Sequence, residues 1–535
     1  HSIAFQGEIF NACDLRRQLD LAAQTPLMPL LLAGWQRWRE RLFARLDGLF
    51  ALAVRDGDDV VLYRDPSGLC GLYRYVDGQG GVAFATDLDV LLRLPGTQQR
   101  LARRSLHEYL RFLEVTAPNT IFDNVSAAEA GLPLHWPARD GAVPLGPETD
   151  VDPQEALPAN LADAVAMLDG YLQRSVRSRL AGAHHPAAFL SGGVDSALLC
   201  AIAARQHKEL TAVTVGFNSA AYDEAPAAQR IALHLGLRHE ALRFSRADYL
   251  DAFERFSRDA EQPMADPTSL ATLLVSEHCR DRHDIVLDGT GADEAVGMLP
   301  ARHVRLAVRS ASLLPAGARR GVGRFMRAAP GLAGFAPILD FEHPADTMIR
   351  WDGFRRPEIE ALCGEPVSFA HTSFYLTFER YQDASPFDLY SALVDAMPGD
   401  RLTQAIRISG VRMGFPFYDR ETDRFLRALP ISYRYAPGEP KRVLRALLTQ
   451  YVPPEIWSGP KRGFTFPLYD FLAADNHLLV RRYLDEGTWL SAAALAQGKV
   501  QAYARQFIAG DRRLTFRIWA LVVLAAWLEH HGSPN

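Results

Sequence analysis

The chain has 535 residues, of which 48% are hydrophobic and 23% charged, and its formal net charge is −5. This composition is typical of a soluble globular protein with more than one buried core, and it excludes a strongly basic surface that would concentrate nucleic acid phosphates. The five cysteines are scattered and never spaced as a CxxC pair, so the sequence predicts neither a disulfide framework nor a zinc knuckle.

The longest strongly apolar stretch, residues 518–528, is shorter than the roughly 18 residues that a membrane-spanning helix needs. We interpret it as a buried C-terminal helix. The opening residues lack the basic and apolar regions of a secretory signal. We therefore expect a cytoplasmic protein that binds neither membranes nor nucleic acids.

The N-terminal region alternates short β-like runs with turn residues between residues 45 and 90, which predicts a small antiparallel sheet system. A stretch rich in proline and glycine follows at 138–147. Apolar residues then recur at helical spacing from Leu161 to Val176. We place a domain boundary near residue 152, giving domains 1–152 and 153–535.

The second domain has a different rhythm. Short β-like runs at 187–190, 211–217 and 284–287 are separated by helical patterns at 197–206 and 225–235. Strand, helix and strand in this order predict a doubly wound α/β fold with a parallel sheet. The region from 300 to 535 is mostly helical by periodicity, and we expect it to complete this domain.

The strongest chemical signal is a glycine-rich turn that follows the run ending at Leu190 and leads into a helix. Gly192 and Gly193 permit positive φ and close backbone approach, so successive amides can converge on an anion. Hydroxyl donors flank the turn at Ser191 and Ser196, and Asp195 is a candidate ligand for Mg²⁺. The lysine of the GxxxxGK[ST] motif is absent, so this is not a Walker-type loop.

A second glycine-rich turn, residues 288–294, also follows an apolar strand. Ligands bind at the carboxyl ends of the strands in doubly wound sheets, where both turns are expected. Asp195 and Asp293 are therefore predicted to approach one magnesium ion from two loops.

The sequence resembles the asparagine synthetases and their relatives among the ATP pyrophosphatases, and the resemblance runs from about residue 5 to the C-terminus. The matching motifs are Ser191-Gly-Gly-Val-Asp-Ser, Val215-Gly-Phe with Tyr222-Asp-Glu, Asp266-Pro-Thr-Ser, Gly289-Thr-Gly-Ala-Asp-Glu, Gly414-Phe-Pro-Phe-Tyr-Asp and Pro460-Lys-Arg-Gly-Phe-Thr-Phe-Pro.

The resemblance implies an enzyme that cleaves ATP between the α- and β-phosphates, transfers AMP to a carboxylate and lets a nitrogen nucleophile displace it. It implies that Leu190, Val215, Asp288 and Gly289 lie against the adenosine. Lys461 matches the lysine that stabilises charge on phosphorus and on the tetrahedral carbon, and it is one of only four lysines in the chain.

The N-terminal region resembles part of the class II glutamine amidotransferase domain, an Ntn-type β-sandwich whose nucleophile is an N-terminal cysteine. Residue 1 is His1, and Cys13 is internal. Gln6 stands where the family has an asparagine that donates to the oxyanion, and Asp87 matches the residue that binds the glutamine amine. As written, the chain is not expected to release ammonia from glutamine.

The synthetase motifs depart from the family pattern at two positions. Thr290 stands where asparagine synthetases carry an acid and β-lactam synthetases a tyrosine, and threonine is a poor general base. Arg412 replaces a glutamate, which suggests that the acceptor recognised nearby is not free aspartate. Glu294 is the remaining candidate base, with an alternative structural role.

Family members without a working glutaminase tend to close amide rings, as the β-lactam and carbapenam synthetases and the lasso peptide cyclases do. A lasso-type macrolactam cyclase is our first hypothesis, since a glycine in the segment 409–419 leaves room for a large substrate. Its partners would be a precursor peptide and a leader-processing protease. Three alternatives stay open: an ammonia-using asparagine synthetase, an ATP pyrophosphatase acting on tRNA, and a non-catalytic ATP-binding scaffold.

Overall fold

A computed structural model describes the chain except for residues 78, 80, 98, 137–156, 220–221, 301–304, 307–309, 312, 329–340, 342, 349–352, 397–400, 460–464 and 533–535. The predicted boundary near residue 152 lies outside these described residues and stays a prediction.

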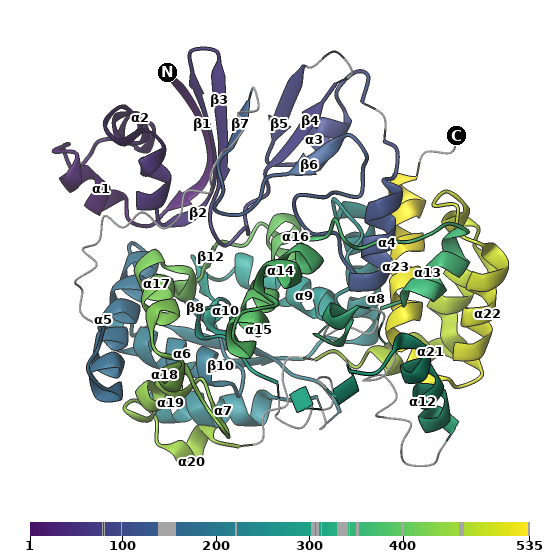
Figure 1. The fold of residues 1–535 in the computed structure, drawn as a ribbon. Helices are drawn as coiled ribbons and strands as arrows, with labels where there is room; N and C mark the ends of the chain where they lie inside the picture. The colour runs from purple at the N-terminus through teal and green to yellow at the C-terminus, as the bar shows by residue number, and fades with distance from the viewer. Residues whose placement is uncertain are drawn as a thin grey trace.

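The N-terminal domain contains two antiparallel sheets, as the alternation of strands and turns predicts (Figure 1). One has the order β1-β2-β3-β7, with strands Ser2–Ile9, Gly48–Asp56, Asp59–Arg64 and Leu134–Trp136. The other has the order β5-β4-β6, with strands Val82–Ala85, Tyr73–Val76 and Val125–Ala127. The helices of this domain are α1 Ala12–Gln18, α2 Leu27–Trp38, α3 Leu88–Leu92 and α4 Arg103–Phe112.

The second domain is built on a parallel sheet of order β10-β9-β8-β11-β12. Its strands are Arg238–Leu242, Thr211–Val215, Ala187–Phe189, Val286–Leu287 and Met413–Gly414. Successive strand residues point to opposite faces. Ala187 and Val286 therefore belong to one core, and Ala188 and Leu287 belong to the other. The expected doubly wound fold is confirmed.

Helices cover both faces of this sheet (Figure 1). The face that carries Ala188 packs against α5 Leu161–Leu180, α6 Val194–Gln206, α7 Ala225–Leu235, α17 Arg420–Ala428 and α19 Arg442–Thr449. The other face packs against α8 Arg246–Asp259, α9 Ser269–Arg280, α16 Arg401–Ser409 and α23 Thr515–His531. The apolar stretch 518–528 is buried within α23, as predicted.

The remaining C-terminal elements are mostly helical, in agreement with the periodicity. They are α10 Ala292–Val296, α12 Ala316–Ala328, α13 Arg356–Cys363, α14 Ser373–Tyr381, α15 Pro386–Asp395, α18 Ile431–Arg434, the hairpin of β13 Tyr435–Ala436 and β14 Glu439–Pro440, α20 Pro454–Trp457, α21 Leu468–Val480 and α22 Gln497–Ile508. Among the described residues, none of the helices is both long and apolar enough to cross a membrane.

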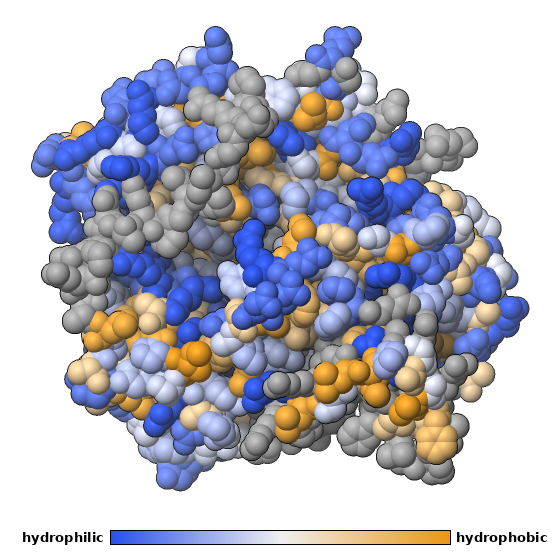
Figure 2. All heavy atoms as spheres, viewed as in Figure 1, coloured by the Kyte–Doolittle hydropathy of each residue, from blue (hydrophilic) through white to orange (hydrophobic). Residues whose placement is uncertain are grey.

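Several exposed apolar side chains lie on α12 and the turn before it. They include Leu313, Leu314, Val322 and Phe325. Apolar atoms gather at the lower right of the face shown in Figure 2, where α12 lies in Figure 1. None of these four side chains lines the cavity described below.

The two domains share one hydrophobic core. Tyr109 of α4 donates a hydrogen bond to the backbone carbonyl of Ala520 in α23 at 2.8 Å, and the ring of Phe122 packs against Trp527 at 5.9 Å. Because such contacts exclude water from both sides, the N-terminal domain is a structural part of the synthetase unit.

Glu261 is a buried carboxylate at this interface, with 1% of its surface exposed. It accepts hydrogen bonds from the Tyr73 hydroxyl at 2.9 Å and from the Leu88 backbone N–H at 2.7 Å, and the Arg407 guanidinium lies 3.7 Å away. Burial raises the pKa of Glu261 to about 7, although the positive charge of Arg407 opposes that change.

We predict that Glu261 makes the folded chain less stable as the pH rises from about 4.5 to 7. The folded state holds the proton more tightly than the unfolded state, so the unfolded state releases it first and stability falls across this interval. The pKa difference corresponds to about 3 kcal/mol. The test is to compare the pH dependence of urea unfolding in wild type and Glu261→Gln. The exposed Glu421→Gln serves as the control, and parallel pH profiles for wild type and Glu261→Gln would contradict the prediction.

Candidate functional site

The first glycine-rich turn connects β8 to the N-terminus of α6. The Ser196 hydroxyl lies 2.9 Å from the Ser191 hydroxyl and accepts a hydrogen bond from the Ser191 backbone N–H at 3.0 Å. The Gly193 N–H donates to the Ser191 hydroxyl at 3.1 Å. These bonds hold the turn in one conformation. The N-terminus of α6 lies at the carboxyl end of β8.

One of the two expected reasons for the glycines, positive φ, is wrong, and the close approach of their backbone to an anion stays a prediction. Neither Gly192 nor Gly193 has positive φ, and Gly193 has φ −85° and ψ 160°. A Cβ atom on Gly192 would lie 2.9 Å from the Cβ of Ala227 in α7, so the close approach of this helix is what excludes a side chain.

The second glycine-rich turn follows β11 and meets the first. A Cβ on Gly289 would lie 3.3 Å from the backbone carbon of Asp195. Asp288 accepts hydrogen bonds from the backbone N–H of Thr290, at 2.7 Å, and from its hydroxyl. Gly291 has φ +99°, a conformation that side chains rarely adopt. The predicted convergence of the two turns is confirmed.

Lys441 joins the two carboxylates at this point. Its ammonium lies 2.5 Å from Asp195 Oδ2 and 2.9 Å from Asp293 Oδ1, and 12% of its side chain is exposed. Burial by itself lowers the pKa of Lys441, but the two carboxylates outweigh burial and raise it. Our sequence reasoning did not identify this residue. The available signal was the scarcity of lysine in the chain.

A cavity of about 280 Å³ opens beside the two turns. The predicted residues that line it are Leu190, Ser191, Gly193, Asp195, Ser196, Val215, Asp288, Gly289, Thr290, Asp293 and Glu294, whereas the predicted Gly192 is not among the lining residues. The structure adds Phe189, Val213, Thr214, Glu224, Thr272 and Val275 to this lining. Lys461 lies outside the described residues, so its catalytic role stays a prediction.

Glu294 has a structural partner as well as a place in the lining. Its carboxylate accepts a hydrogen bond from the Gly291 backbone N–H at 3.1 Å, which closes the second turn on itself. Burial raises the pKa of Glu294, and the neighbouring charge of Asp293 adds to this effect. A buried carboxyl group with a raised pKa is better suited to hold a proton than an exposed one.

The structure gives Arg412 and the glycines of segment 409–419 roles other than substrate recognition. Arg412 precedes β12, at the amino end of the strand, and its Nε donates to the carboxylate of Glu8 at 2.8 Å. It therefore does not line the cavity. Within 409–419, a Cβ on Gly414 would lie 3.0 Å from Leu287 and 3.1 Å from Arg179, so this glycine serves packing. Gly410 has φ +69° and follows α16.

In the N-terminal domain, the Gln6 amide oxygen accepts a hydrogen bond from the Thr86 hydroxyl. Asp87 caps α3 by accepting the Asp89 N–H at 2.9 Å, and Arg407 lies 3.6 Å from its carboxylate. A positive side chain thus faces the residue that was matched to the glutamine-amine ligand.

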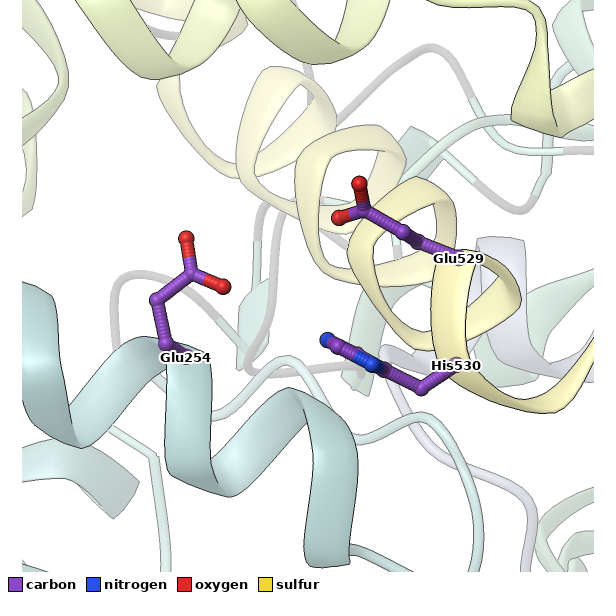
Figure 3. A group of neighbouring side chains, drawn as sticks. All are labelled: Glu254, Glu529 and His530. Carbon is purple, nitrogen blue, oxygen red and sulfur yellow. The ribbon is translucent and has the colours of Figure 1, made fainter.

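A separate group of possible metal ligands lies between α8 and α23. Glu254, Glu529 and His530 point toward one another in Figure 3. The guanidinium of Arg482 already bridges the two carboxylates, 2.9 Å from Glu254 and 3.1 Å from Glu529. Because this cation balances their charge, we assign no metal to the group.

A parallel sheet with two glycine-rich turns at the carboxyl ends of adjacent strands, facing paired acids, defines a doubly wound α/β domain with the ligand-binding position typical of nucleotide-binding folds. The chain belongs to the asparagine synthase family, whose model matches residues 167–529. The model of the glutamine amidotransferase domain matches residues 1–143. Membership identifies a ligase that forms carbon–nitrogen bonds with ATP.

Full-length relatives agree with this assignment. A Mycobacterium tuberculosis (strain H37Rv) protein, provisionally described as a glutamine-hydrolysing asparagine synthetase, is 26% identical over 574 residues, which cover 100% of this chain and 85% of the relative. Asparagine synthetase 1 of Bacillus subtilis, also described as glutamine-hydrolysing, is 22% identical over 98% of this chain and 85% of its own length. Neither description mentions a peptide cyclase.

We predict that Gly291→Ala destabilises the fold more than Gly236→Ala does. Both glycines have positive φ, but a Cβ at 236 meets nothing within 4 Å, whereas one at 291 lies 3.1 Å from the ring of Tyr418. We expect a loss of about 1 kcal/mol for Gly236→Ala and about 2 to 3 kcal/mol for Gly291→Ala. Chemical denaturation of both variants is the measurement, and equal losses would show that the second turn tolerates a side chain.

Proposed function

We propose that the cavity binds MgATP and that the enzyme activates a carboxylate as its acyl-adenylate before an amine forms the amide. The observation that carries this proposal is the meeting of the two turns, with Asp195 and Asp293 reaching one cation. The substrate carboxylate oxygen attacks the α-phosphorus, and pyrophosphate leaves. The amine then attacks the carbonyl carbon, AMP leaves, and the nitrogen loses a proton.

The lining divides into an apolar and a polar part, which suits a nucleotide. Leu190, which follows β8, and Val213 and Val215 of β9 offer an apolar surface for the adenine. The turn from Ser191 to Ser196 offers hydroxyls and the N-terminus of α6 for the phosphates. The adenosine contacts at Leu190, Val215, Asp288 and Gly289 remain proposals on this basis.

The paired acids fit a hard divalent cation. Asp195 and Asp293 present carboxylate oxygens from two loops, and Mg²⁺ prefers such ligands together with substrate phosphates. When bound, Mg²⁺ would neutralise the charge of the departing pyrophosphate. Lys441 supplies positive charge at the same point, because its ammonium lies within 2.9 Å of a carboxylate oxygen of each acid.

Asparagine is the amide that the relatives' descriptions favour, and both describe glutamine-hydrolysing enzymes. For this chain the first candidate is asparagine formation with aspartate as the carboxylate and ammonia as the attacking nitrogen. The second candidate is closure of an amide ring, lasso-type macrolactam formation included, and Thr290 is the one observation in its favour. Threonine offers no acid where asparagine synthetases carry one, and its hydroxyl already donates to Asp288. The precursor peptide and protease belong to this second candidate only.

We predict that turnover releases AMP and pyrophosphate, and that Asp293→Asn abolishes it without unfolding the chain. The change removes a charged oxygen ligand from a half-buried position at the cavity but keeps the side chain's shape. The assay is nucleotide chromatography with aspartate and ammonium as substrates, and Asp281→Asn is the surface control. ADP and phosphate as products would contradict the proposal. Asparagine in the mixture would exclude ring closure as the main activity.

We also predict that Lys441→Met binds Mn²⁺ more tightly than wild type in the absence of nucleotide, while its turnover falls. Without the ammonium, Asp195 and Asp293 hold an unbalanced negative charge that attracts a divalent cation. Loss of one preorganised cation commonly reduces rate by about 10² to 10³. Mn²⁺ titration followed by electron paramagnetic resonance is the measurement, with Lys208→Met as control. Unchanged Mn²⁺ affinity would show that Lys441 does not compete with metal.

A further inference from the structure

The end of the β1–β2 pair in the N-terminal domain meets the last strand of the synthetase sheet. Asp47 immediately precedes β2, and its backbone is held on both sides. Its carbonyl accepts the Phe10 N–H at 2.8 Å, and its N–H donates to the Asn11 side chain at 3.0 Å. In Figure 1, β12 lies directly below this end of β2. Asp47 is therefore presented to the second domain from a rigid position.

Arg179 of α5 receives Asp47 in a two-pronged ion pair. Its two terminal nitrogens lie 2.9 and 2.8 Å from the two carboxylate oxygens, and only 2% of the Arg179 side chain is exposed. The guanidinium also lies over the ring of Phe10, 4.7 Å from its centroid. A paired guanidinium without access to water has one favourable position, so Asp47 determines where Arg179 lies.

Arg179 in turn shapes the segment 414–419 that follows β12. Its Cγ would lie 3.1 Å from a Cβ on Gly414, and its Nη1 is 3.5 Å from Asp419 Oδ2. One turn earlier in α5, the Ser175 hydroxyl donates to the Pro416 carbonyl at 2.9 Å. Both ends of this segment thus rest on α5.

The same segment supports the second glycine-rich turn. The Asp288 backbone N–H donates to the Gly414 carbonyl at 3.0 Å. Gly291 lies so close to Phe417 and Tyr418 that a Cβ there would be 3.2 and 3.1 Å from them. Asp288 and Gly291 lie on either side of Thr290, and Asp293 is two residues after Gly291. The position of 414–419 therefore limits the positions that the turn can adopt.

We infer that Asp47 is a positioning residue of the synthetase reaction: through Arg179 and the segment 414–419, it holds the turn 288–294 in place. The inference rests on the proposed use of that turn in binding MgATP. It gives the amidotransferase-like domain a function in the ligase reaction that does not depend on glutamine hydrolysis.

The test compares Asp47→Asn and Arg179→Lys with Glu8→Gln. Glu8 is a matched control because its ion pair with Arg412 also joins the N-terminal domain to β12, but at the amino end of the strand and exposed to solvent. Hydrogen exchange by mass spectrometry is measured over the turn 288–294. Calorimetry of the full chain with MgATP gives the affinity.

We expect faster exchange in the turn and about tenfold weaker MgATP binding in Asp47→Asn and Arg179→Lys, with Glu8→Gln unchanged. Arg179→Lys keeps the buried charge, so it carries the test if Asp47→Asn does not fold. Unchanged exchange in the turn of the folded variants, or the same change in Glu8→Gln, would overturn the inference. If wild type binds no MgATP, the proposed function fails, while the exchange comparison still decides whether Asp47 holds the turn.

Discussion

The site depends on two carboxylates brought together at adjacent strand ends, with one ammonium between them. Asp195 and Asp293 come from turns that touch at Gly289, and a cation between two like charges offsets their repulsion. Lys441 supplies that charge from the start of α19. Around this group, neighbouring atoms leave little room for a side chain at Gly192, Gly289 and Gly291. The hydroxyls of Ser191 and Ser196 stabilise the first turn.

The interface between the domains uses charges in a second way. Asp47 with Arg179, and Glu261 with Arg407, lie where the N-terminal domain meets the helices and strands of the synthetase. A buried charge that loses its partner is costly, so these pairs favour the one arrangement of the two domains in which the partners meet. The apolar core that the two domains share contributes most of the free energy that holds them together, because buried ion pairs rarely add much stability. The amidotransferase-like domain is consequently part of the framework around the cavity.

Two of the residues that suggested an unusual substrate have structural roles instead. In the sequence, Arg412 suggested an acceptor other than aspartate, and a glycine in the segment 409–419 suggested room for a large substrate. In the structure, Arg412 pairs with Glu8, and Gly414 packs on Arg179 and Leu287. Thr290 is the remaining departure from the asparagine synthetase pattern that lines the cavity. Its hydroxyl donates to Asp288, so the side chain helps to shape the second turn.

The sequence by itself determined the doubly wound sheet, the buried helix at 518–528 and both glycine-rich turns, because periodicity and turn chemistry act over a few neighbouring residues. It also identified most of the cavity lining, since residues at strand ends gather at one edge of a parallel sheet. Only the tertiary structure decided the role of Lys441, which lies 246 residues from Asp195 in the chain. The same is true of Arg412 and Gly414. Their roles depend on which distant side chain arrives beside them, and no local pattern encodes that.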